Sequence, residues 1–142
     1  MSSINFFEED ISFRLKNKNK VKQWIKTTIE AEGYTLKELN YIFCSDQYLL
    51  HINQQYLDHD TYTDIITFDN SDTEKTITGD IFISIERIRE NAIKFNSGEI
   101  NELHRIIIHG ALHLLGYQDK TAENKRIMTG KENYYLDRRN FT

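Results

Sequence analysis

Two histidines and a carboxylate stand at a spacing that suits a metal ion. His109 and His113 are followed by Gly116 and Asp119 in the order H-x-x-x-H-x-x-G-x-x-D. On a helix, residues four apart lie about 40° apart around the axis and about 6 Å apart along it, so both imidazoles can reach one ion. A left-handed turn at Gly116 would end that helix and let Asp119 return beneath the same face. Two imidazoles and one carboxylate leave a fourth position for water, which is typical of a catalytic zinc site.

The residues around the histidines favour a metal over a fortuitous pair. Histidines on an apolar helix are partly buried, and a buried imidazole without a polar partner or an ion is costly. The sequence therefore predicts His109, His113 and Asp119 as ligands of one ion. The apolar residues of this stretch are Ile106, Ile107, Ile108, Ala111, Leu112, Leu114 and Leu115.

Two other metal chemistries share parts of this pattern. The spacing matches the metzincin protease motif H-E-x-x-H-x-x-G-x-x-H, with Asp119 at the last ligand position. The glutamate that accepts a proton from the attacking water in those proteases is Gly110 here, so a peptidase would need another base. The same donor types also form the two-histidine, one-carboxylate triad of non-haem iron oxygenases, although this helical spacing is unusual for it.

The helices and strands that must position these residues are predicted from the periodicity of apolar residues. Because the chain contains no proline, their ends are predicted from Gly, Asn and Asp. Aromatic and β-branched runs predict strands, and apolar residues at three- and four-residue spacing predict helices. We expect an α+β fold: one mixed sheet of four to five strands with about five helices, and the metal site on a central helix and the turn after it. The strands are predicted at 4–7, 11–15, 39–44, 64–68 and 76–85, the last two pairing as a hairpin, and the helices at 20–32, 45–56, 86–96, 97–115 and from Thr121 onward, with a loop at 58–62.

Length and composition limit the class of protein. The chain has 142 residues, of which 39% are hydrophobic and 28% charged, which predicts a single globular domain over residues 1–142. No apolar stretch approaches the roughly 20 residues that span a bilayer, and the first ten residues lack the pattern of a signal peptide. Cys44 is the single cysteine, so no intramolecular disulfide can form, and we expect it to be a buried strand residue. A cytoplasmic protein without a membrane partner is the expectation.

The charge is uneven along the chain. The formal net charge is −4, which gives no overall attraction to nucleic acid. Residues 14–26 nevertheless carry +6 and no acidic residue, which leaves −10 on the rest. Such a run is usually a solvated face, and the alternative is an edge that contacts phosphates. Its six cations are Arg14, Lys16, Lys18, Lys20, Lys22 and Lys26.

Three segments resemble a known family. The stretch from His109 to Tyr117, HGALHLLGY, is similar to the signature H-G-x-L-H-L-x-G-Y-D-H of the YbeY family, the bacterial rRNA maturation endoribonucleases. TDIITF at 63–68 resembles the family's T-D-V-L-S-F strand, and GDIFIS at 79–84 its G-D-I-x-I-S strand. Asn53 and Tyr56 fit the helix before them, so the resemblance spans about residues 53 to 119 and includes several specific motifs.

The resemblance implies a zinc-dependent, single-strand-specific endoribonuclease. Its implied roles are 3′-end maturation of 16S rRNA and ribosome quality control, with single-stranded RNA, rRNA and the ribosome as partners and one zinc ion as cofactor. His109 and His113 match the family's first two ligands. The third, usually His, is Asp119, and Leu57 stands where the family typically carries an arginine that could contact phosphate. A carboxylate is a competent zinc ligand, whereas the phosphate contact is expected to be weaker.

Several other residues are weaker candidates for chemistry, each with a structural role as the alternative. Attack by the substrate's own 2′-hydroxyl would need a base, for which His59 is one candidate and His51 and His104 are weaker ones. Asp64 and Asp80 at strand starts are at least as well explained by turns or caps. The aromatic residues Phe6, Phe7, Tyr34, Tyr41, Phe68 and Phe82 could stack bases but are more often core. A peptidase and a non-catalytic ribosome assembly factor that binds a metal are the alternative functions.

Overall fold

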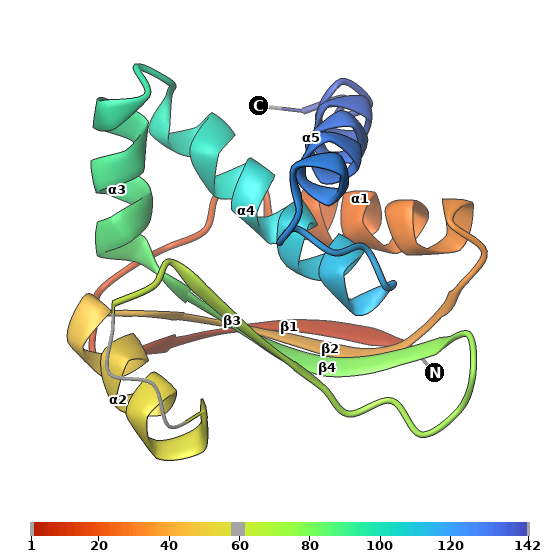
Figure 1. Ribbon diagram of the computed structural model, residues 1–142, viewed down its shortest axis with the longest axis horizontal. Helices are drawn as coiled ribbons and strands as arrows, with labels where there is room; N and C mark the ends of the chain where they lie inside the picture. Colours follow the sequence, from red (N-terminus) through yellow and green to blue (C-terminus); the bar gives the residue numbers. More distant parts are fainter. Residues whose placement is uncertain (1, 58–61, 142) are drawn as a thin grey trace.

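A single four-stranded mixed sheet forms the centre of the computed structural model, which describes residues 2–57 and 62–141 (Figure 1). The strands run in the order β1-β2-β4-β3. The first three are mutually parallel, and β3 pairs antiparallel with β4, which confirms the predicted hairpin. Their bounds are β1 Ser3–Glu9, β2 Thr35–Cys44, β3 Ile65–Asp69 and β4 Thr76–Ser84.

Five helices in the described residues pack on this sheet, so the α+β class is confirmed. Figure 1 shows α1, α3, α4 and α5 above the sheet and α2 below it. The α4 helix runs across the middle of the upper layer, between α3 and α5. The bounds are α1 Lys18–Ala31, α2 Asp46–Leu57, α3 Ile85–Lys94, α4 Glu99–Leu114 and α5 Ala122–Leu136.

The period-two alternation of β4 divides the core between the two faces. Ile81 and Ile83 are fully buried in the larger hydrophobic cluster, under the four upper helices. Phe82, between them in sequence, packs on the opposite face with Leu49 and Ile52 of α2. Successive strand residues point to opposite faces, so the apolar run Ile81-Phe82-Ile83 must be covered on both sides of the sheet. This requirement explains why one helix lies apart from the other four.

Side-chain caps begin two of the predicted helices where the sequence indicated. The Ser45 hydroxyl accepts a hydrogen bond from the Tyr48 amide at the start of α2. The Thr121 hydroxyl accepts one from the Asn124 amide at the start of α5. Each cap satisfies an amide that has no partner within the helix.

The strand predicted at 11–15 is wrong. Asp10 has a φ of 57°, and this left-handed residue turns the chain out of the sheet directly after β1. The following residues make no strand, yet Leu15 is buried and the Phe13 ring lies 5.0 Å from the Phe43 ring. The apolar residues of 11–15 alternate as they would in a strand, but their side chains cover the core beside the edge strand β1. An irregular segment can bury alternate side chains as well as a strand can.

Cys44 is fully buried in β2, as expected. Burial raises the pKa of its thiol to about 12, and the nearby Asp46 and Asp10 carboxylates add to the shift. Because the thiolate is the reactive form, this cysteine is chemically inert at neutral pH. In the described part of the chain no helix has the length and apolar character needed to cross a membrane. Most of the loop predicted at 58–62, including His59, lies outside the described residues.

Candidate active site

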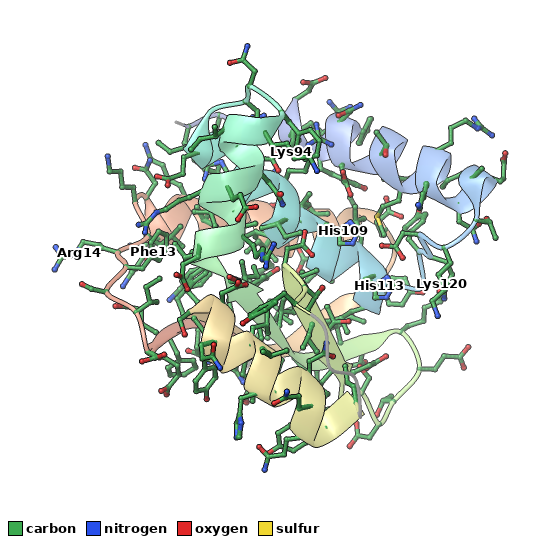
Figure 2. The ribbon with its side chains drawn as sticks, turned by 60° about the vertical axis from the view of Figure 1, so that its left-hand side comes forward. Phe13, Arg14, Lys94, His109, His113 and Lys120 are labelled. Atoms are coloured by element: carbon green, nitrogen blue, oxygen red, sulfur yellow. The ribbon has the colours of Figure 1, made fainter. Side chains whose placement is uncertain are left out.

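The helix that carries both histidines lies unusually close to the sheet. A Cβ atom at Gly110 would stand 3.0 Å from side-chain atoms of both Ile65 and Ile81. Glycine therefore permits the close approach of α4 to β3 and β4. This approach leaves His109 and His113 at the side of the helix, where both line a cavity of about 410 Å³ between α4, α3, β3 and the segment after α4. Figure 2 shows the two rings on one face of α4.

His109 lies between two carboxylates. Its Nδ1 donates to Glu132 Oε2 at 2.7 Å, and its Nε2 lies 3.2 Å from Asp119 Oδ2. Glu132 comes from α5 and is almost fully buried, and it also accepts from Arg105 Nη1 at 2.8 Å. Burial by itself lowers the pKa of His109, but the Glu132 hydrogen bond and the charges of Glu132, Asp119 and Asp64 outweigh burial and raise it. The Nε2 edge of this imidazole is thus directed at Asp119, the predicted third ligand.

His113 is oriented by the turn that ends its helix. Its Nδ1 donates to the Tyr117 carbonyl at 2.9 Å, which leaves Nε2 as the ring nitrogen available to a ligand. Gly116 makes that turn with a φ of 101°, in the left-handed region predicted for it. The two imidazole rings stack nearly parallel, with centroids 6.1 Å apart. A histidine whose Nδ1 is held by a carboxylate or carbonyl has the orientation that metal-ligating histidines show.

The three predicted ligands are brought together only in part. His109 and Asp119 are in direct contact, and His113 lines the same cavity. Among residues 2–57 and 62–141, however, no group of three His, Cys, Asp or Glu side chains meets the geometry of a common ion site. The ligand set therefore stays a prediction. The donor chemistry fits zinc, because two oriented imidazoles and one carboxylate are among its usual ligands.

Three further polar side chains line the cavity, and of these the sequence offered only Asp64, with a turn or cap role at least as well supported as catalysis. Asp64 precedes β3, Arg105 lies one helical turn before His109, and Glu132 arrives from α5. Burial raises the pKa of the Asp64 carboxyl, and the charge of Asp119 adds to this, against opposing hydrogen bonds and His109. The four-residue spacing of Arg105 and His109 was a usable signal, whereas nothing local could connect Glu132 with a helix 23 residues away.

The segment after α4 is held by a partly buried carboxylate that directly follows α1. Glu32 accepts hydrogen bonds from the Tyr117 hydroxyl at 2.6 Å and Lys131 Nζ at 3.0 Å, and a third from the Tyr135 hydroxyl. Burial raises the pKa of this carboxyl, but the three hydrogen bonds and the Lys131 charge together lower it below its usual value. The contacts join α1, α5 and Tyr117, whose carbonyl orients His113. These contacts therefore fix Tyr117, at the start of the segment that carries Asp119, the predicted third ligand.

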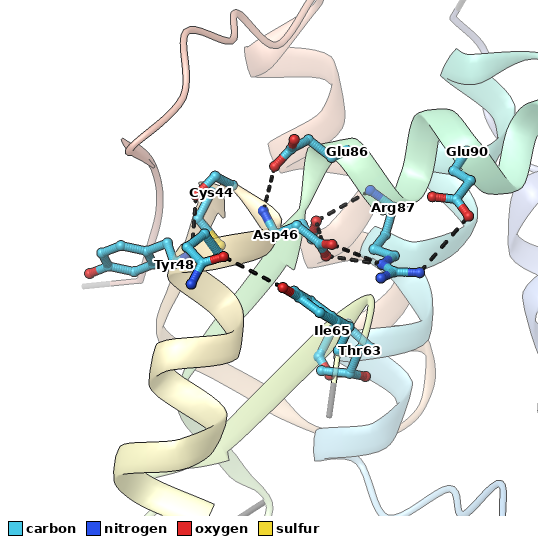
Figure 3. A network of polar contacts seen from close by, with 12 residues as sticks. Cys44, Asp46, Tyr48, Thr63, Ile65, Glu86, Arg87 and Glu90 are labelled. Carbon is cyan, nitrogen blue, oxygen red and sulfur yellow. Dashed lines mark hydrogen bonds and ion pairs between the residues drawn. The ribbon is translucent and has the colours of Figure 1, made fainter. Parts of the chain in front are cut away.

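A second network holds the segment that carries Asp64 (Figure 3). Arg87 at the start of α3 pairs with Asp46 of α2, with Nε 3.0 Å from Oδ1, and its guanidinium lies 5.1 Å from the Tyr62 ring. Tyr62 in turn donates to Gln47, and the Thr63 hydroxyl donates to the Ile65 carbonyl. These contacts set where the chain enters β3, and hence where Asp64 lies.

The remaining candidates lie away from the cavity. His104 is buried beside Trp24 and accepts from Arg139, and burial followed by the Arg139 charge lowers its pKa to about 4, so it is a neutral core histidine. His51 is exposed on α2, and Asp80 accepts from Asn40 and Asn70 on the other side of the sheet. Both His104 and Asp80 therefore lie outside the cavity, but Asp80 stands inside β4 and accepts from side chains there, so the turn or cap predicted for it is wrong. Of the aromatic candidates, Tyr41 and most of the others pack in the two hydrophobic clusters.

Replacing Glu132 by glutamine is expected to weaken zinc binding about 10- to 100-fold, because the uncharged amide no longer raises the basicity of His109. Zinc affinity can be measured by competition with a chromophoric chelator, beside thermal unfolding to confirm the fold. Glu123→Gln is the matched control, since Glu123 is exposed on the same helix and its ion pair is with Arg126, three residues away. Equal zinc affinity of the Glu132→Gln and Glu123→Gln variants would contradict this role.

Comparisons with known proteins agree with one another. A family model described as Endoribonuclease YbeY matches residues 3–140. The Endoribonuclease YbeY of Cytophaga hutchinsonii is 50% identical over 139 residues, covering 98% of this chain and 97% of the relative. That of Karelsulcia muelleri is 50% identical over 133 residues, covering 94% and 93%. The solution structure of TM1509 from Thermotoga maritima superposes with a TM-score of 0.67 at 27% identity, over 95% of this chain and 87% of that one.

Proposed function

The chain belongs to the YbeY family of endoribonucleases, and we propose that it is a zinc-dependent enzyme that cuts single-stranded RNA in the cytoplasm. Its proposed substrate is the precursor of 16S rRNA, with roles in 3′-end maturation and in the removal of defective ribosomes. One zinc ion is the proposed cofactor, held by His109, His113 and Asp119. The cavity that these three residues line is the observation that carries the proposal.

The charge of the cavity supports the need for a cation. Among residues 2–57 and 62–141, four carboxylates line it, against a single guanidinium from Arg105. They belong to Asp64, Glu102, Asp119 and Glu132. Such a site repels the phosphates of RNA unless positive charge is added, because like charges in a confined, partly buried space interact strongly. A divalent cation held by His109, His113 and Asp119 would supply that charge.

A bound zinc ion lowers the pKa of a coordinated water and polarises a phosphoryl oxygen. The protein's own groups have separate tasks around it. Glu132 and the Tyr117 carbonyl hold the two imidazoles with Nε2 towards the cavity. Asp64, which lines the same cavity, is the proposed acceptor for the proton of the attacking oxygen. Arg105, kept in place by Glu132 and Asn133, neutralises part of the phosphate charge.

Two surfaces outside the cavity bear on how RNA is held. Leu57, at the end of α2, is 40% exposed and offers no charge where the family typically has arginine, so Arg105 takes a larger share of the phosphate contacts. Residues 14–26, which carry a charge of +6, cover the β1–α1 connection and the first turns of α1. Most of their cationic side chains are exposed. We propose this segment as the contact to the ribosome or to rRNA beyond the cleavage site.

The direct test is cleavage of an end-labelled RNA that contains both a single-stranded region and a duplex region. The protein is first stripped of metal with a chelator and then assayed with and without one equivalent of zinc. We expect no cleavage before zinc is restored, and cuts confined to the single-stranded region afterwards. The new RNA ends identify the attacking group, since attack by the 2′-hydroxyl leaves a 2′,3′-cyclic phosphate and attack by water does not.

Cleavage that persists undiminished after chelation would refute the zinc dependence. Cuts in the duplex as frequent as those in the single strand would refute the proposed specificity. The peptidase alternative receives no support from the fold, because the position of the protease glutamate is occupied by Gly110, packed against Ile65 and Ile81.

A further inference from the structure

One large aromatic side chain in the cavity is left facing solvent. Phe95, at the C-terminal end of α3, is 61% exposed and lines the cavity that holds His109 and His113. Of the large exposed hydrophobic side chains that the structure describes, it is the one in this lining. Phenylalanine has no polar group to place in water, so exposing it forgoes the free energy that burial supplies. An exposed ring beside reactive groups suggests a ligand that covers it.

The backbone holds Phe95 rigidly. It is the C-cap residue directly after α3, and the Ser97 amide donates to the Ala92 carbonyl while the Asn96 amide donates to the Ile93 carbonyl. With Asn96 at a φ of 53°, these two bonds form a Schellman motif, a well-defined helix end. The Ser97 hydroxyl also donates to Glu102 of α4. The backbone that carries the ring is thus fixed where α3 ends and α4 begins.

We propose that Phe95 is a stacking platform for an unpaired nucleobase of the substrate, one that flanks the scissile phosphate. This inference rests on the proposed RNA substrate and adds a base subsite to it. A ring with an exposed face accepts any nucleobase, and each base stacked on an aromatic side chain contributes enough free energy to matter for binding. Stacking requires a base that is free of its own helix, so the platform also gives a physical reason for selecting single strands.

Two neighbours complete the subsite. Lys94 Nζ lies 5.4 Å from the centre of the Phe95 ring, and Figure 2 shows Lys94 on the same side of the molecule as His109. This ammonium lies over the ring and outside the carboxylate-rich lining of the cavity, where it can contact the phosphate next to a stacked base. Asn91, one helical turn before Phe95, lines the same cavity and brings an amide that can donate to a base edge and accept from it.

The test measures both cleavage and binding. Steady-state cleavage of a single-stranded RNA should show a KM about 5- to 150-fold higher for Phe95→Ala, with kcat little changed, which is the range expected for one lost base stack. Phe95→Trp should keep the wild-type KM, and Phe95→Leu should resemble Phe95→Ala. The matched control is Ile93→Ala, since Ile93 is 83% exposed two residues away and does not line the cavity. Removing Phe95 leaves no cavity in the core, so these variants fold.

Base removal in the RNA provides a complementary readout. A series of substrates, each lacking one base, should bind the wild-type protein weakly at one position, and that loss should vanish in Phe95→Ala. An RNA with fluorescent 2-aminopurine at that position should be quenched by the wild-type protein and not by Phe95→Ala. An unchanged KM in Phe95→Ala, or equal behaviour of the leucine and tryptophan variants, overturns the inference.

Failure of this inference differs from failure of the proposed function. If the wild-type protein cuts RNA and Phe95→Ala cuts it with the same KM, the base subsite is refuted and the nuclease stands. If no RNA is cut, the proposed function fails, and the 2-aminopurine signal still decides whether Phe95 stacks a base. A Phe95→Ala protein that loses a protein partner while its RNA binding is unchanged would mark the exposed ring as a protein contact and overturn the subsite.

Discussion

Replacement of His113 by alanine is expected to lower kcat/KM for single-stranded RNA about a thousandfold or more, because the several kcal/mol that a bound metal contributes to the transition state would be lost. His113 lines the cavity, and its Nδ1 is already committed to the Tyr117 carbonyl. The side chain is only partly buried, so alanine should leave the fold intact. Cleavage of labelled RNA and zinc content by elemental analysis, measured on identically prepared proteins, check both effects.

His51→Ala is the matched control for this experiment, because His51 is exposed on α2, on the other side of the sheet. It loses a histidine without touching the cavity, and it should cut RNA and bind zinc as the unaltered protein does. Equal cleavage by His113→Ala and the unaltered protein would mean that a contaminating nuclease cuts the RNA, or that His113 has no part in the reaction. In that case a role in binding the ribosome, without cleavage, would become the better explanation.

Gly110→Glu is expected to destabilise the protein by more than about 4 kcal/mol, enough to prevent folding of a domain of ordinary stability. Even a Cβ atom would stand 3.0 Å from the Ile65 and Ile81 side chains, and a carboxylate would be forced against the apolar face of the sheet without a partner. Urea unfolding measures the loss of stability if the variant is soluble. If the variant does not fold, the protein will be missing from the soluble fraction.

Gly130→Glu provides the comparison. Gly130 lies on the exposed face of α5, and a Cβ atom there meets nothing within 4 Å. Glutamate should therefore stabilise the protein slightly, by about 0.5 to 1 kcal/mol, because a helical glycine is replaced by a better helix former. A Gly110→Glu protein as stable as Gly130→Glu would show that α4 does not approach the sheet closely. It would also reopen the protease-like arrangement, in which that position carries the base.

Much of the fold could be predicted from local pattern. The helix from 97 to 115 and the 64–68 and 76–85 hairpin were foreseen because each has a strong period and flanking breaks that depend only on nearby residues. The 11–15 segment was mistaken for a strand, because alternation shows which side chains are buried and not whether the backbone joins a sheet. That outcome depends on the left-handed turn at Asp10, which is a tertiary choice at the edge of β1.

By itself the sequence determined the parts of the site that lie within one helix and its turn: His109 and His113 on one face, Gly116 at the helix end, and Asp119 within reach. Their relation follows from helical geometry, which any sequence with this spacing obeys. Tertiary structure alone decided what surrounds them. Glu132 on His109, Asp64 in the cavity and Phe95 at its edge come from separate elements, and contacts between elements depend on packing of the whole core rather than on local spacing. The same holds for Gly110. The sequence shows it only as a position without the protease glutamate, whereas the structure shows it as the point where α4 contacts the sheet.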